Sequence, residues 1–174
     1  MKTIIQRKVC LLGDFGVGKT SLVRRFVEGR FDEKYLSTIG VQISRRVVTL
    51  DHEEKINLVI WDVSGGEEFN GKEISYLQGA SGALLVCDLT RKTTLVSLPK
   101  YVKAMRAIAP SAKFVLLANK SDLVSQFEMG ADEIASMASQ IDCPWFITSA
   151  KTGEQVEEAF TKLAQALIPP QRRN

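Results

Sequence analysis

The sequence is poor in the residue types that most catalytic centres and metal sites use. It has one histidine, His52, and three cysteines without a CxxC pair among 174 residues. A histidine general base, a zinc cluster and a disulfide framework are therefore disfavoured. The free thiols favour a reducing, cytoplasmic compartment.

Long apolar runs, internal repeats and low-complexity tracts are also missing. No apolar run reaches the roughly 18 residues of a membrane-spanning helix, and the N-terminal residues lack the apolar core of a secretory signal. The formal net charge of +3 is too small to favour nucleic acid as a partner. The length predicts a single domain over residues 1–174.

Short apolar runs alternate with segments of helical periodicity, which predicts an α/β fold. We expect strands over 7–12, 39–50, 55–61, 82–87, 113–118 and 145–148, and helices over 21–28, 98–108, 131–140 and 156–168. Ser97 is expected to cap the second helix, and Thr152 with Gln155 to form a capping box before the last. This order predicts a mostly parallel six-stranded sheet in three layers, with helices on both faces and ligands at the carboxyl ends of the strands.

The strongest motif is GDFGVGKT at residues 13–20, between the first strand and the first helix. Its glycines let successive N–H groups point at phosphate oxygens, and the helix adds its positive end. Lys19 brings a charge to the β- and γ-phosphates, and the Thr20 hydroxyl can bind Mg²⁺. A glycine-rich turn without a ligand is the alternative, and the flanking strand and helix disfavour it. The expected phosphate contacts are Asp14, Phe15, Gly16, Val17, Gly18, Lys19, Thr20 and Ser21.

Three shorter motifs follow other expected strands. Asp62 can approach Mg²⁺, usually through water, and the Gly65 N–H can reach a γ-phosphate. In Asn119-Lys120-Ser121-Asp122 a carboxylate can accept both N–H groups of the guanine Watson–Crick edge, whereas adenine would leave it unpaired. The backbone of Ser149-Ala150-Lys151 can cap the guanine O6, although this last motif alone is a weak signal.

Four motifs in this order resemble the Ras superfamily of small GTPases across nearly the whole chain. The segments STIGV (37–41) and YLQGA (76–80) resemble the Rab branch in particular. The resemblance implies a P-loop NTPase fold of the Ras-like G-domain type, GTP or GDP and Mg²⁺ as ligands, and hydrolysis of GTP to GDP and phosphate. It implies metal contacts at Thr20, Thr38 and Asp62, further nucleotide contacts at Phe31, Tyr35, Thr38, Gly65, Asn119, Lys120, Asp122, Ser149, Ala150 and Lys151, and catalytic roles for Lys19, Thr38, Gly65 and Gly66.

The resemblance also implies protein partners. Effectors, an exchange factor and an activating protein would contact residues around 35–45 and 62–80, and we expect a monomer. Rab proteins meet effectors through an aromatic surface triad, whose matching positions are Ile43, Trp61 and Tyr76, so one aromatic is replaced. Simple core packing of Trp61 and Tyr76 is an equal alternative.

Three departures from the family pattern bear on catalysis and membrane attachment. Gly66 stands where the family carries the glutamine that orients the attacking water. Phe15 replaces a small residue and should obstruct an arginine finger, which contributes about 10³–10⁵ in rate. The sequence ends PPQRRN without a cysteine to prenylate, so we expect membrane contact to be weak or to come through a partner.

Three functions are compatible with these features. The first is a GTP-binding switch with slow, Mg²⁺-dependent hydrolysis, in which Glu67, Glu68 or a glutamine from a partner replaces the missing side chain. The second is a non-cycling GTP-binding interaction module with negligible hydrolysis, which Phe15 and Gly66 motivate. The third, an ATP-using phosphotransferase, is disfavoured by Asp122 and its neighbours.

Overall fold

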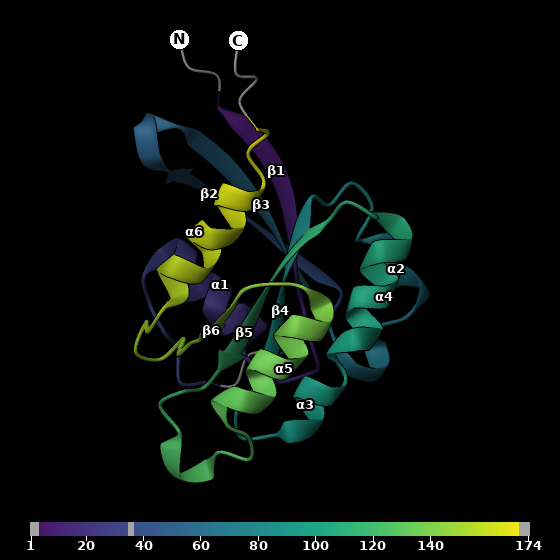
Figure 1. Ribbon diagram of the computed structural model, residues 1–174, viewed down its shortest axis with the longest axis vertical. Helices are drawn as coiled ribbons and strands as arrows, with labels where there is room; N and C mark the ends of the chain where they lie inside the picture. Colours follow the sequence, from purple (N-terminus) through teal and green to yellow (C-terminus); the bar gives the residue numbers. More distant parts are fainter. Residues whose placement is uncertain (1–3, 35–36, 171–174) are drawn as a thin grey trace.

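The computed structural model describes residues 4–34 and 37–170. The strands among these residues form one six-stranded sheet. The strands are β1 (Ile5–Leu12), β2 (Val41–Thr49), β3 (Lys55–Val63), β4 (Gly82–Asp88), β5 (Lys113–Asn119) and β6 (Trp145–Ile147). They lie in the order β2-β3-β1-β4-β5-β6 (Figure 1). Strand β2 runs antiparallel to β3, and the other described pairs are parallel. The predicted sheet is confirmed.

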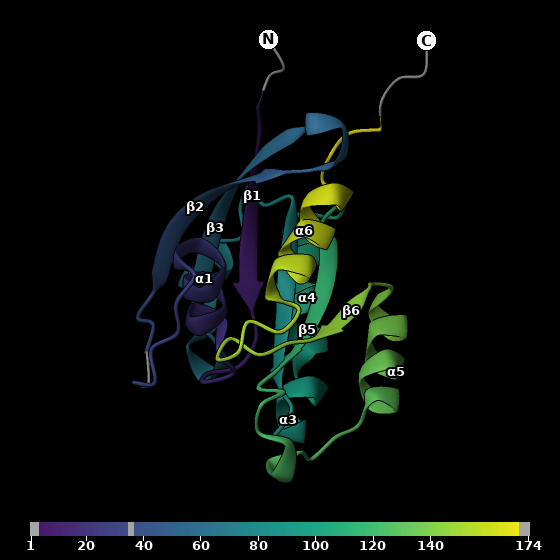
Figure 2. The ribbon, with the colours of Figure 1, turned by 90° about the vertical axis from the view of Figure 1, so that its left-hand side faces the viewer.

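Helices cover both faces of this sheet. They are α1 (Lys19–Glu28), α2 (Gly71–Ser75), α3 (Lys92–Val96), α4 (Leu98–Ile108), α5 (Ala131–Ile141) and α6 (Val156–Ala166). Buried apolar residues of α1 and α6 belong to one cluster, and those of α3, α4 and α5 belong to a second. Figure 1 shows α1 and α6 on the side of the sheet opposite α2, α3 and α4, and Figure 2 looks onto the α1 and α6 side. The predicted three layers are therefore present.

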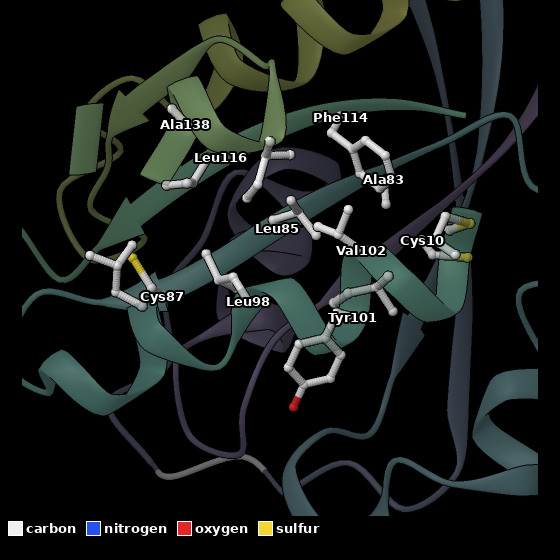
Figure 3. Packing of buried hydrophobic residues seen from close by; sticks show 14 of the residues in the cluster. Cys10, Ala83, Leu85, Cys87, Leu98, Tyr101, Val102, Phe114, Leu116 and Ala138 are labelled. Atoms are coloured by element: carbon white, nitrogen blue, oxygen red, sulfur yellow. The ribbon is translucent and has the colours of Figure 1, made fainter. Parts of the chain in front are cut away.

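The central strand β4 shows why its sequence is a continuous apolar run. Successive side chains of a strand point to opposite faces, and both faces of β4 are covered. Leu84 packs in the cluster with Phe160 of α6, and Leu85 packs in the cluster with Tyr101 of α4. Figure 3 shows Leu85, Cys87 and Tyr101 within the second cluster.

Neither predicted cap makes a capping hydrogen bond with its side chain, although Ser97 does stand at the N-cap position of α4. Gln155 itself precedes α6 in a left-handed conformation (φ 51°) and makes no capping hydrogen bond with its side chain, so the expected capping box does not form. Ser97 is helical because α3 runs directly into α4, and its hydroxyl donates to Asp14 instead. The five-residue helices α2 and α3 were not predicted because they are too short for a full apolar stripe. No helix within residues 4–34 and 37–170 has the length and apolar character to span a membrane.

Candidate functional site

The loop between β1 and α1 surrounds a buried lysine. Lys19 is the first residue of α1, and its side chain folds back so that Nζ donates to the carbonyl oxygens of Gly13 (2.8 Å) and Asp14 (3.0 Å). The residue is only 6% exposed. Burial lowers the pKa of Lys19 to about 8, although the charges of Asp62 and Asp14 oppose this shift. Because burial disfavours the charge of this ammonium group, a strongly anionic ligand beside it would stabilise the charged form.

Three oxygen-bearing side chains meet beside this lysine. Thr20 Oγ1 lies 2.5 Å from both Asp62 Oδ2 and Thr38 Oγ1, and Thr38 Oγ1 lies 3.4 Å from the same carboxylate oxygen. Burial raises the pKa of Asp62, while hydrogen bonds from Thr20 and Thr38 and the charge of Lys19 lower it. The other oxygen, Asp62 Oδ1, is buried and has no hydrogen-bond partner among the described residues. Buried polar atoms are normally satisfied, so this one indicates a missing partner.

A cavity of about 380 Å³ opens over the phosphate loop. The predicted site residues that line it are Phe15, Gly16, Gly18, Lys19, Thr20, Ser21, Phe31, Thr38, Gly65, Asn119, Lys120, Asp122, Ala150 and Lys151. Asp32, Glu33, Lys34, Ser64 and Leu123 line it too. These five were missed, and their only signal is that each lies next to or near a predicted residue in the sequence.

The remaining predicted residues lie beside the cavity rather than on its wall. They are Asp14, Val17, Asp62, Gly66 and Ser149. Val17 is the fully buried member of the phosphate-loop motif among these residues, and Ser149 Oγ donates to Asp122 Oδ1 (2.7 Å). Tyr35 falls outside the described residues.

Asn119 ties three loops of the site together. It ends β5 and is 2% exposed. Its Nδ2 donates to the Val17 carbonyl (3.0 Å), while its Oδ1 accepts from Thr148 Oγ1 (3.2 Å) and from the Ala150 N–H (3.3 Å). These bonds hold the phosphate loop at a fixed place relative to the loop after β6. Asp122, three residues further along the same motif, lines the cavity.

Asp88, at the end of β4, links the motif at residues 119–122 with the phosphate loop. Its Oδ2 accepts from Lys120 Nζ (2.8 Å) and Arg91 Nε (3.0 Å), and Arg91 also donates to the Phe15 carbonyl (3.0 Å). Burial raises the pKa of Asp88, but the Lys120 and Thr90 hydrogen bonds outweigh it, so the pKa lies below its usual value. The carboxylate therefore stays charged and keeps both cations in place.

Tyr101 is a side chain whose part in the site the sequence did not reveal. Its spacing placed it in the apolar stripe of α4, and it is fully buried. However, its hydroxyl donates to Asp14 Oδ1 (2.6 Å) and accepts from the Gly66 N–H (2.9 Å). A tyrosine in an apolar stripe can place its polar end outside the core, but the sequence does not say what that end meets.

The family of the chain follows from comparison with known proteins. The model of the Ras family matches residues 8–169. The chain belongs to the Ras family. The Ras-related protein Rab-13 of Canis lupus familiaris is 35% identical over 162 residues, which cover 92% of this chain and 79% of the relative. Rab-13 of Bos taurus matches with the same identity and coverage. The predicted likeness to the Rab branch is confirmed, and with it the general function of a GTP-binding switch.

Ras-family proteins bind guanine nucleotide together with Mg²⁺, and the cluster around Asp62 fits that ion. Its donors are two hydroxyls and a carboxylate, and Mg²⁺ prefers oxygen ligands. The orphaned Asp62 Oδ1 is the atom that such a cation, or a water on it, would satisfy. When bound, Mg²⁺ supplies positive charge that stabilises the phosphates. Thr20, Thr38 and Asp62 are the residues that would hold the ion, and Lys19 would supply a second positive charge beside it.

We expect Asn119→Ala to destabilise the protein as well as weaken nucleotide binding. The change removes three hydrogen bonds and leaves the buried Val17 carbonyl and the buried Ala150 N–H unpaired. The free energy of unfolding should fall by about 2–3 kcal/mol. Urea denaturation followed by circular dichroism measures it. Gln126→Ala, at an exposed residue after the same strand, should change it by less than about 0.5 kcal/mol. Equal losses in the two variants would contradict the loop-tying role.

Proposed function

We propose that the protein is a Mg²⁺-dependent molecular switch of a single domain that binds GTP tightly and hydrolyses it slowly. The observation that carries the proposal of slow hydrolysis is that residue 66 is a glycine in a left-handed backbone conformation. This residue follows Gly65, whose position on the cavity wall suits a contact with the γ-phosphate. It has φ +70°, a conformation that side-chain-bearing residues rarely adopt. No side chain therefore extends from this position to orient an attacking water.

The neighbouring Phe15 strengthens the proposal. A Cβ added at Gly66 would lie 3.5 Å from Phe15 Cβ, so the two residues are in contact range. The Phe15 side chain is 49% exposed and lies at the cavity wall. An arginine supplied by an activator would have to pass this ring. Activation through a glutamine from the partner is therefore favoured over an arginine finger alone.

The expected result is hydrolysis of bound GTP below about 10⁻⁴ s⁻¹, slower than the intrinsic rate of a small GTPase that has the glutamine. Gly66→Gln should raise the rate about tenfold, because an amide next to Gly65 can orient the water. Single-turnover assays with Mg²⁺ and preloaded GTP measure both rates.

Gly66→Ala is the matched control for this experiment. It imposes the same backbone strain at φ +70° as glutamine but adds no amide. The alanine variant should therefore hydrolyse GTP no faster than the unaltered protein. An ordinary small-GTPase rate in the unaltered protein, together with no gain from glutamine, would show that the interpretation of Gly66 is wrong.

The second candidate function is a GTP-binding module that does not cycle. The same two residues favour it, because Gly66 lacks an orienting side chain and Phe15 hinders an activator. The nucleotide on freshly purified protein discriminates between the candidates. Mostly GDP supports the slow switch, and mostly GTP supports the non-cycling module.

The proposed effector surface lies beside the site. Ile43 is 50% exposed and opposite Trp61 in the β2–β3 register, and the Trp61 and Tyr76 rings are 6.1 Å apart. Lys8 Nζ lies 3.6 Å from the centre of the Trp61 ring. Trp61 and Tyr76 are half-buried, so they pack against the core and still present surface to a partner. We propose that effectors, exchange factors and activators contact this patch together with the described parts of segments 35–45 and 62–80.

A further inference from the structure

One hydroxyl connects the phosphate loop with the segment that follows β3. Tyr101 Oη accepts the Gly66 N–H at 2.9 Å and donates to Asp14 Oδ1 at 2.6 Å. Asp14 belongs to the phosphate loop, and Gly66 begins the turn Gly66–Glu68 that leads toward α2. Figure 3 shows the Tyr101 ring among the apolar side chains of the cluster, with its oxygen pointing away from them.

The surroundings make Tyr101 a rigid connector. Its ring packs against Phe69, with ring centres 4.7 Å apart, and the whole side chain is buried. The second oxygen of Asp14 accepts from Ser97 Oγ at 2.7 Å, so the carboxylate is held from two positions on the α3–α4 segment. Burial and the Asp14 carboxylate raise the pKa of Tyr101 well above its usual value. The hydroxyl therefore keeps the proton that it donates.

We infer that Tyr101 is a positioning residue that holds the backbone at Gly66 against the phosphate loop in both nucleotide states. This inference rests on the proposed switch. In that switch the γ-phosphate orders the segment after β3 through the neighbouring Gly65, and hydrolysis releases it. A hydrogen bond from Gly66 to the protein body does not depend on the γ-phosphate. It limits how far the segment is released in the GDP state.

The consequence is a smaller structural difference between the two nucleotide states. Segment 66–70 is held by Tyr101 in both states, so its order differs less between GDP and GTP than it would without the hydroxyl. Removing the hydroxyl leaves the γ-phosphate as the main source of order. The GDP form should then loosen more than the GTP form.

The test compares Tyr101→Phe with Ser97→Ala in protein loaded with GDP or with a non-hydrolysable GTP analogue. Phenylalanine keeps the ring that contacts Phe69 and removes only the hydroxyl. Amide hydrogen exchange of Gly66, resolved by NMR, should accelerate about three- to tenfold in the GDP form, and less in the analogue form. Ser97→Ala also removes one hydrogen bond to Asp14 but leaves the Gly66 link, so exchange at Gly66 should change less than about twofold.

A second measurement needs no variant. In the unaltered protein the Tyr101 hydroxyl proton should be slow to exchange and should show a nuclear Overhauser effect to the Gly66 amide proton. Absence of that effect, unchanged exchange in Tyr101→Phe, or equal acceleration in both variants would overturn the inference. Failure of the protein to bind guanine nucleotide would instead contradict the proposed function, while the Gly66 amide would remain measurable in the unloaded protein.

Discussion

Asp122→Ala is expected to reduce the affinity for GDP by about 10²–10⁴-fold, because two N–H groups of guanine would lose a charged acceptor at about 1.5–3 kcal/mol each. Asp122 lines the cavity, and Ser149 Oγ donates to its Oδ1 at 2.7 Å. That bond fixes the carboxylate before the base arrives. Competition against a fluorescent GDP analogue measures the loss.

The expected loss is specific to the base, which separates it from damage to the fold. Binding of ADP should be weak in the unaltered protein and should not weaken further in Asp122→Ala, so the preference for guanine collapses. Ser149→Ala is the matched control, because it keeps the carboxylate and removes only the bond that orients it. Its affinity for GDP should fall by about three- to tenfold. Equal losses for GDP and ADP in Asp122→Ala would contradict base recognition by this residue.

The sequence predicted the layers of the fold because burial leaves a direct pattern in it. Strands β4 and β5 pack on both faces and are therefore continuously apolar between their polar ends, while α4 and α6 carry a single apolar stripe. Caps were less predictable because they depend on neighbours. Ser97 has the right side chain for a cap, but α3 continues into α4, and Asp14 takes the hydroxyl.

The site divides in the same way. Residues 13–20 and 119–122 were predicted because phosphate and base chemistry need those residue types next to one another in the chain. The contacts of Tyr101 with Asp14 and Gly66 were not predicted, because the partners are 87 and 35 residues away along the chain. The role of Arg91 at the Phe15 carbonyl was missed for the same reason. Such long-range polar contacts come from the packing of helices on the sheet, which a residue pattern does not reveal.

Lys19→Met should produce a comparably large effect through the phosphates. Methionine keeps most of the apolar stem and removes a cation that is 6% exposed beside the cavity. The affinity for GDP should fall by about 10²–10⁴-fold, because charge-assisted bonds to phosphate oxygens are each worth about 1.5–3 kcal/mol. Isothermal titration calorimetry with Mg²⁺ and GDP measures the change. The loss should be larger for a non-hydrolysable GTP analogue, since Lys19 serves the γ-phosphate as well.

Stability should respond quite differently from affinity. Burial lowers the pKa of Lys19 to about 8, which means that the fold alone disfavours its charge at this place. Removing the charge therefore relieves its desolvation cost, which offsets the loss of the two hydrogen bonds from Lys19 Nζ to the Gly13 and Asp14 carbonyls. The free energy of unfolding of nucleotide-free Lys19→Met should stay within about 1 kcal/mol of the unaltered protein. Lys34→Met, at an exposed lysine on the same cavity, should change the affinity for GDP by less than about threefold. Equal losses in the two lysine variants would mean that general charge attraction, and not the buried ammonium, holds the phosphates.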